Sequence, residues 1–123
     1  MPKKVLDVGN CSPDHSAIRD LIERNFDAVV TQAHGLEDTL ELMRHSTFDL
    51  VLVNRKLDRN YSDGLRIIQE IKLDDGLRTV PVMLMTNYEE HQELARQAGA
   101  ETGFGKLSLD TPATIDHLAQ WLS

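Results

Sequence analysis

The stretch "VLVNRKLD", residues 51–58, changes abruptly from apolar to polar. Its first three residues belong to the apolar run "FDLVLV" (48–53), which is typical of a strand that is covered on both faces of a parallel sheet. Asn54 and the residues that follow it are polar, so we expect the strand to end there. Sites in such sheets form where the strands end. Asn54 is therefore the first candidate site residue.

The rest of the chain repeats the same pattern, in which a short apolar run precedes an amphipathic stretch. Strands are expected at 4–8, 28–33, 48–53, 80–86 and 101–105, and helices at 11–26, 36–45, 63–76, 87–98 and 111–122. This alternation predicts an α/β fold, with a five-stranded parallel sheet, helices on both faces and right-handed crossovers. The result is a three-layer sandwich.

The helix expected at 87–98 differs from the others because its apolar face is thin. Only Leu94, Ala95 and Ala98 are available to pack inward, which indicates mobility or docking of a partner on this side. Asn87 and Glu90 are spaced as in a capping box, so we expect them to begin this helix.

Length and charge limit the classes of function. A chain of 123 residues predicts a single domain, 1–123, which can also be the leading domain of a longer protein. The 20 acidic and 13 basic residues give a net charge of −7, which argues against nucleic-acid binding by this domain and against an anionic membrane surface. The single cysteine, Cys11, cannot form an internal disulfide, and no apolar run is long enough to span a membrane. We therefore expect a cytoplasmic protein.

Several motifs, in their order and spacing, resemble the receiver domains of bacterial response regulators. These motifs are "FDLVLV" (48–53), Asp63–Gly64, "VPVMLMT" (80–86), "ARQAGAE" (95–101) and Lys106. The resemblance covers essentially the whole chain. It implies a flavodoxin-like fold of the CheY-like type and a non-enzymatic role in two-component phosphorelay signalling.

The resemblance also implies where a phosphorylation site would lie. In the family, an aspartate at the end of the third strand accepts a phosphoryl group from a histidine kinase. Magnesium is held by this aspartate, by an acidic pair after the first strand and by a carbonyl two residues beyond the acceptor. Asn54 stands at the acceptor position, Gly9 and Asn10 at the acidic pair, and Lys56 at the carbonyl position. All three carboxylates are therefore missing.

Other positions of the family's site are partly retained. Thr86 and Lys106 match the hydroxyl and the lysine that contact the phosphoryl oxygens, whereas Gly103 stands where the family has an aromatic switch residue. An amide cannot attack phosphorus as a carboxylate does, and magnesium prefers anionic oxygen ligands. We expect no cofactor, weak or absent magnesium binding, and an Asn54 amide that bonds to Thr86 or Lys106.

The leading hypothesis is an atypical receiver, or pseudo-receiver, that works without phosphorylation as a protein-interaction module. Its partner would be a histidine kinase, an attached effector domain or a second copy. Binding would use the face made by the helix at 87–98, the strand at 101–105 and the last helix.

Two alternatives stay open. One is a receiver with a relocated acceptor, Asp58 or Asp7. The other is a small-molecule-binding domain of flavodoxin type. Asp7 lies inside the first strand, so it needs a partner such as an arginine or histidine from a helix. The role of Cys11 is open.

Overall fold

A computed structural model describes all residues 1–123, and its elements follow the predicted alternation. The strands are β1 (Lys3–Val8), β2 (Ala28–Ala33), β3 (Leu50–Asn54), β4 (Val82–Met85) and β5 (Glu101–Phe104). The helices are α1 (Ser12–Asn25), α2 (Leu36–His45), α3 (Leu65–Leu73), α4 (Glu89–Gln97) and α5 (Pro112–Leu122), with a 3-10 turn at Lys106–Ser108. The five strands form one parallel sheet in the order β2-β1-β3-β4-β5.

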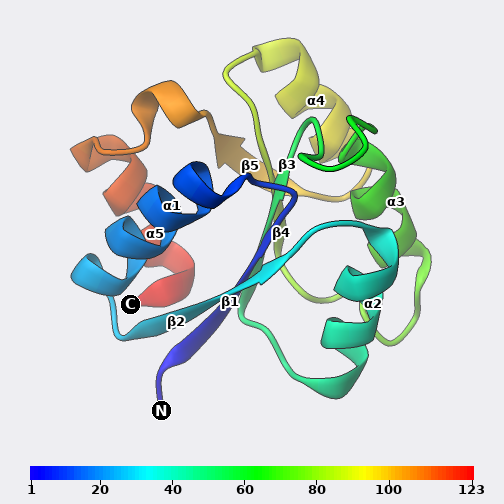
Figure 1. Cartoon of the computed structure of the whole chain (residues 1–123), viewed down its shortest axis with the longest axis horizontal. Helices are drawn as coiled ribbons and strands as arrows, with labels where there is room; N and C mark the ends of the chain where they lie inside the picture. Colours follow the sequence, from blue (N-terminus) through cyan, green and yellow to red (C-terminus); the bar gives the residue numbers. More distant parts are fainter.

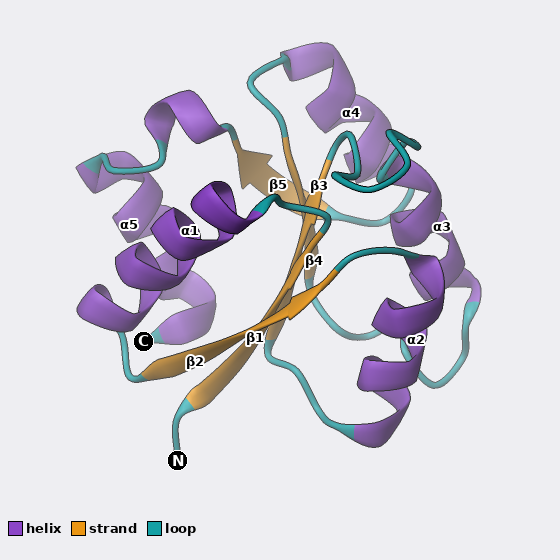
Figure 2. Cartoon of the chain, viewed as in Figure 1, coloured by secondary structure: helices purple, strands orange, loops and turns teal.

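The sheet is the middle layer of a three-layer sandwich. Figure 2 shows α1 and α5 on one face of the sheet, and α2, α3 and α4 on the other. The central strand β3 is buried on both faces, because Leu50 and Leu52 belong to one apolar cluster whereas Val51 and Val53 belong to the other. The near-continuous apolar run at 48–53 is therefore explained by burial of both faces.

The carboxyl ends of β1 and β3 form the part of the fold that matters for function. β1 pairs with β2 on one side and with β3 on the other. The connection after β1 therefore leads to one side of this strand, and β3 is added on the opposite side. Loops that diverge in this way leave a crevice at the strand ends. Gly9, Asn10 and Asn54 all lie at this crevice.

One local prediction was wrong. α4 begins at Glu89, after Tyr88, and no side chain caps its first turn. The side chain of Asn87 instead accepts a hydrogen bond from the backbone N–H of Leu107, at 3.2 Å. Asn87 therefore joins the β4–α4 loop to the loop after β5.

None of the helices combines the length and the apolar character that crossing a membrane would require.

Candidate functional site

Asn54 ends β3, and its side chain bonds to the backbone on both sides of the crevice. The Nδ2 atom donates to the carbonyl oxygen of Gly9 at 3.1 Å and to that of Lys56 at 2.7 Å. The prediction that this amide bonds to Thr86 or Lys106 was therefore wrong. Two carbonyl oxygens lie closer, and poorly solvated carbonyls need donors. The NH₂ group of Asn54 thus supplies a hydrogen-bond donor to each of these two carbonyl oxygens.

The side chain of Leu57 packs against Gly9 at the crevice. The φ of Gly9 is +80°, in the left-handed region that favours glycine. A Cβ atom at Gly9 would lie 2.4 Å from Cδ2 of Leu57, so the side chain of Leu57 occupies the space that a side chain at position 9 would need. Leu57 is itself buried in the apolar cluster on that face.

Asn10 turns into the protein and away from the crevice. Its Nδ2 atom donates to Oδ1 of Asp7 at 2.6 Å, and Nδ1 of His15 lies 2.7 Å from Oδ2 of the same carboxylate. Asp7 is 0 % exposed. Its predicted helix-borne partner is confirmed as His15 of α1. Burial raises the pKa of Asp7, whereas its hydrogen bonds with His15 and Asn10 act to lower it.

These residues do not suit the magnesium ion that receiver domains use. Gly9 has no side-chain ligand, Asn10 faces Asp7, and the amide hydrogens of Asn54 point at backbone oxygens that would otherwise be available. Magnesium needs several oxygen ligands, carboxylates above all, in near-octahedral geometry. No group of three or more His, Cys, Asp or Glu residues in the chain could hold a metal ion. The three positions at which the family carries these carboxylates therefore offer no anionic oxygen.

Lys106 reaches a carboxylate on α1. Its Nζ atom lies 2.8 Å from Oδ2 of Asp14, and both side chains are partly exposed. The hydrogen bond from Lys106 holds the pKa of Asp14 below its usual value. The lysine is therefore neutralised within the chain.

Thr86 is buried at the end of β4 and takes part in the β4–α4 loop. Its Oγ1 atom accepts from the backbone N–H of Tyr88 at 3.3 Å and lies 3.3 Å from Nδ1 of His91. Its hydroxyl thus links the strand end to the first turn of α4.

Gln92 of α4 joins β4 to β5. Its Nε2 atom donates to the carbonyl oxygens of Leu84 (3.0 Å) and Thr86 (3.3 Å), and its Oε1 atom accepts from the N–H of Gly103 (2.9 Å). The β4–β5 register shifts between Met83 and Met85, beside this amide. A Cβ atom at Gly103 would lie 2.1 Å from the Leu84 carbonyl oxygen. No side chain fits there, whether aromatic or not.

The thin apolar face predicted for α4 is thinner still in the structure. Only Gln92 and Ala95 are buried on this helix, whereas Leu94, predicted to pack inward, is 49 % exposed. The three hydrogen bonds of Gln92 hold the helix where apolar packing is sparse.

The two acids considered as relocated acceptors lie in different surroundings. Asp7 is fully buried and both of its oxygens have partners, which argues against access by a phosphodonor. Asp58 is partly exposed, and its Oδ2 atom lies 3.5 Å from Nδ1 of His34. Cys11 is exposed and precedes α1 without capping it.

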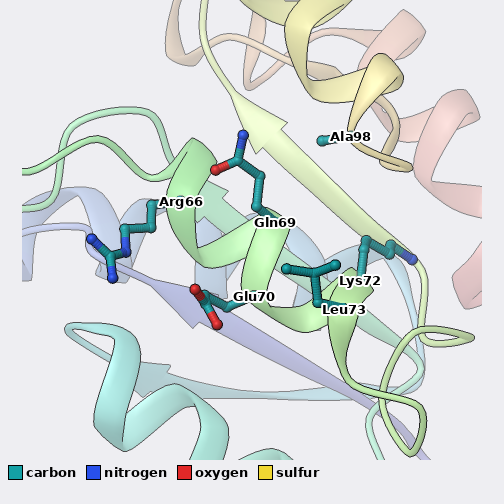
Figure 3. Close-up of a pocket in the computed structure, with 6 residues that line it drawn as sticks. All are labelled: Arg66, Gln69, Glu70, Lys72, Leu73 and Ala98. Carbon is teal, nitrogen blue, oxygen red and sulfur yellow. The ribbon is translucent and has the colours of Figure 1, made fainter.

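A hollow of about 640 Å³ lies beside α3 and the end of α4 (Figure 3), and none of Gly9, Asn10 and Asn54 lines it. Its lining consists of Arg66, Gln69, Glu70, Lys72, Leu73 and Ala98. Only two of these six residues are apolar, whereas small-molecule sites are lined mostly by apolar side chains. The hollow gives no support to a small-molecule function.

Sequence reasoning missed three contributors to this region: Gln92, Leu57 and Asp14. Gln92 and Ala95 are three residues apart and therefore share one side of α4. A glutamine on the inward side of this helix, opposite Gly103 of β5, was the signal that could have identified Gln92. Asp14 and Lys106 are 92 residues apart. No local pattern reports their contact.

Comparisons with known proteins identify the family of the chain. The family model of the response regulator receiver domain matches residues 13–108. The polar-differentiation response regulator DivK of Brucella anthropi is 32% identical over 124 residues, which cover 99% of this chain and 98% of that protein. DivK of Brucella ovis is 30% identical with the same coverage.

Solved structures share the fold. The receiver domain of a DNA-binding response regulator from Colwellia psychrerythraea superimposes with a TM-score of 0.80 at 21% identity, covering 96% of each chain. The phosphorylated cyanobacterial phytochrome response regulator RcpA gives 0.80 at 20% identity, covering 100% of this chain and 96% of the other. The predicted fold class is thereby confirmed.

Proposed function

This chain belongs to the family of response regulator receiver domains, and from that premise we propose that it works in two-component signalling without being phosphorylated. In this proposal it is a cytoplasmic interaction module with no enzymatic activity of its own. It binds a histidine kinase, an effector domain or a second copy through the face made by α4, β5 and α5.

The amide nitrogen of Asn54 is the observation that carries the proposal. It donates to two backbone carbonyls, Gly9 and Lys56, at the position where the family has an anionic nucleophile. An amide in this arrangement is neutral, and its nitrogen lone pair is delocalised into the carbonyl group, so it is a far weaker nucleophile toward phosphorus than a carboxylate. The closure of the crevice by Leu57 against Gly9 supports the same conclusion.

The state of Lys106 also supports the proposal. In the family this lysine meets the negative charge of the phosphoryl group, whereas here Asp14 already provides a carboxylate at 2.8 Å. An arriving phosphoryl group would have to displace this ion pair, so the lysine offers little additional stabilisation.

The proposed partner face and the segments next to it expose apolar side chains. Leu94 of α4 is 49 % exposed, Tyr88, which precedes α4, is 62 % exposed, and Leu107, in the turn after β5, is 89 % exposed. Aromatic and apolar residues of this kind form the cores of protein interfaces, and charged residues form their rims. A protein partner therefore suits this face better than a small ligand does.

One experiment tests the closed crevice directly. Magnesium chloride with beryllofluoride, which mimics a bound phosphoryl group, is added to the isotopically labelled protein, and amide chemical shifts are recorded. We expect the shifts to stay unchanged because the crevice lacks anionic ligands. Saturable changes centred on Asn54 would contradict the proposal.

A second experiment tests covalent phosphorylation. The protein is incubated with acetyl phosphate and magnesium, and its intact mass is measured beside a receiver that keeps the aspartate. We expect a phosphoryl gain only in that positive control. A gain in this chain that vanishes on Asp58→Asn would replace the proposal with the relocated-acceptor alternative.

A further inference from the structure

The loop between β3 and α3 carries three cations that form no salt bridge. The loop lies at the carboxyl edge of the sheet (Figure 1) and contains Arg55, Lys56 and Arg59. None of the three forms a salt bridge, and the Nε atom of Arg55 is buried with no hydrogen-bond partner. Arg59 lines a hollow that also contains Glu37, Asp38 and Glu41 of α2, so Arg55 and Lys56 form the more positive part of this patch. Without these three cations, the chain has 10 basic and 20 acidic residues, a balance of −10, so the loop is more basic than the rest of this acidic protein.

The two acids of the same loop do not pair with these cations. Oδ2 of Asp58 lies 3.5 Å from Nδ1 of His34, and its Oδ1 atom is buried with no hydrogen-bond partner. Oδ1 of Asp63 accepts from the N–H of Leu65 at 2.9 Å. Neither carboxylate forms a salt bridge with Arg55, Lys56 or Arg59, so these cations can meet an external anion.

The backbone of the loop is ordered by its own hydrogen bonds. The N–H of Leu57 donates to Ser62 at 2.9 Å, and that of Tyr61 donates to Leu57 at 3.0 Å. Arg55 donates to Met85 and accepts from Gly64, so both sides of its peptide are held. A surface that is already ordered loses less conformational entropy when it binds.

Tyr61 adds an aromatic side chain to the patch. It is 72 % exposed, and its ring centroid lies 5.6 Å from Nζ of Lys56. Its φ is +58°, a left-handed value that is uncommon for a residue other than glycine. Strained residues of this kind cluster at binding sites, so an exposed aromatic held there is a second, independent sign of an interface.

We propose that the loop from Arg55 to Tyr61 binds an acidic segment of a protein partner. Carboxylates of that segment meet Arg55, Lys56 and Arg59, and an adjacent side chain packs on Tyr61. Arginine and tyrosine are the residues that most often dominate binding energy at interfaces. The negative charge on the rest of the chain disfavours a long polyanion such as nucleic acid, but a short acidic segment need only meet the patch. This inference rests on the proposed interaction function, and it adds the β3–α3 loop as a second contact surface beside the α4–β5–α5 face.

The test uses a fluorescein-labelled hexaglutamate peptide as the probe. The peptide is titrated into the whole chain at low salt, and both fluorescence anisotropy and amide chemical shifts are followed. We expect saturable shifts confined to residues 55–61, and binding that weakens as salt screens the charges.

Matched variants separate a specific patch from general charge. Arg55→Gln and Arg59→Gln should each weaken binding about fivefold or more, and Tyr61→Ala should weaken it with no change of charge. Arg19→Gln on α1 removes the same charge from an exposed residue outside the loop, and should leave the affinity within about twofold. Unchanged amide spectra outside the loop establish that each variant is folded.

Three outcomes would overturn the inference. Equal losses for Arg19→Gln and Arg55→Gln would mean unspecific attraction, and the absence of localised shifts would mean an ordinary solvated loop. Tighter binding of a hexathymidylate, or equal competition by inorganic phosphate, would assign the patch to another class of anion. No phosphodonor is used, so failure here leaves the acetyl phosphate result, and with it the proposed function, intact.

Discussion

Asn54 and Gln92 are both amide side chains that bond to strand-end carbonyls, but they do so in different surroundings. Asn54 is partly exposed and uses only its NH₂ group, on Gly9 and Lys56. Gln92 is 5 % exposed and uses both ends of its amide, between β4 and β5. Water can replace the bonds of Asn54, but it reaches those of Gln92 poorly. The amide of Gln92 is therefore expected to stabilise the β4–β5 region more than the amide of Asn54 stabilises the crevice.

Removing the Gln92 amide should have the largest effect. Gln92→Ala leaves the N–H of Gly103 and the carbonyl of Leu84 without their partner and opens a cavity under α4. We expect a loss of about 2–4 kcal/mol in the free energy of unfolding, measured with urea. Gln97→Ala, on the exposed side of the same helix, is the control and should change stability by less than about 0.5 kcal/mol. Equal losses in the free energy of unfolding for Gln92→Ala and Gln97→Ala would show that the buried hydrogen bonds of Gln92 do not hold α4 to β4 and β5.

Changing Asn54 should have a smaller effect, because its surroundings are wetter. Asn54→Asp keeps the shape but turns a carboxylate toward the carbonyl oxygens of Gly9 and Lys56, so we expect a loss of about 1–3 kcal/mol near neutral pH. Asn54→Ala, which removes the donor without adding repulsion, should cost about 1 kcal/mol. Urea unfolding of both variants checks the order. An Asn54→Asp variant as stable as the parent would mean that the carbonyl pair is not what fixes this side chain.

The pH dependence of stability distinguishes the buried carboxylate of Asp7 from the partly exposed carboxylate of Asp14. Burial raises the pKa of Asp7 in the folded state, so its contribution to stability is complete below the usual value of 3.8 and is lost as pH rises through the raised folded value. Compared with Asp7→Asn, the parent should therefore lose free energy of unfolding as pH rises above the usual value of 3.8. Unfolding of both proteins at these pH values measures the difference.

Asp14 should show the opposite slope. Lys106 lowers the pKa of Asp14, so the parent should gain stability over Asp14→Asn as pH rises, with the gain lost again as pH falls below the usual value of 3.8. The change is small because the Asp14 side chain is 42% exposed. Slopes of the same sign for the two variants would contradict the roles of burial and of Lys106.

The smallest effect is expected at Tyr61. Asparagine tolerates a positive φ better than tyrosine does, so Tyr61→Asn should raise the free energy of unfolding by up to about 1 kcal/mol while it weakens binding of the acidic probe. A variant that is both less stable and fully able to bind would show that the aromatic ring serves the fold.

The layers and strands of the molecule were predictable because burial leaves a direct mark on the sequence. Residues 50–53 are apolar on both faces of the strand, which is typical of a strand in the middle of a sandwich. The positions of Asn54, Gly9 and Asn10 followed from the same logic, since parallel strands end at one edge.

The partners of the site residues could not be predicted in the same way. Asn54 was expected at Thr86 or Lys106, but short backbone distances across the crevice decided its contacts. The Asp14–Lys106 pair and the insertion of Gln92 beside Gly103 join elements that periodicity treats as independent. Such contacts depend on loop shape and side-chain rotamers, on which a repeating apolar pattern carries no information.

The contact between Gly9 and Leu57 has a consequence for the history of such a domain. A return to the family's pattern needs acids at positions 9, 10 and 54. It also needs Leu57 to shift or be replaced, because a Cβ at position 9 would lie 2.4 Å from its Cδ2 atom. A single substitution restores only one of the three carboxylates, so several changes must occur together before the crevice offers the anionic ligands that magnesium prefers.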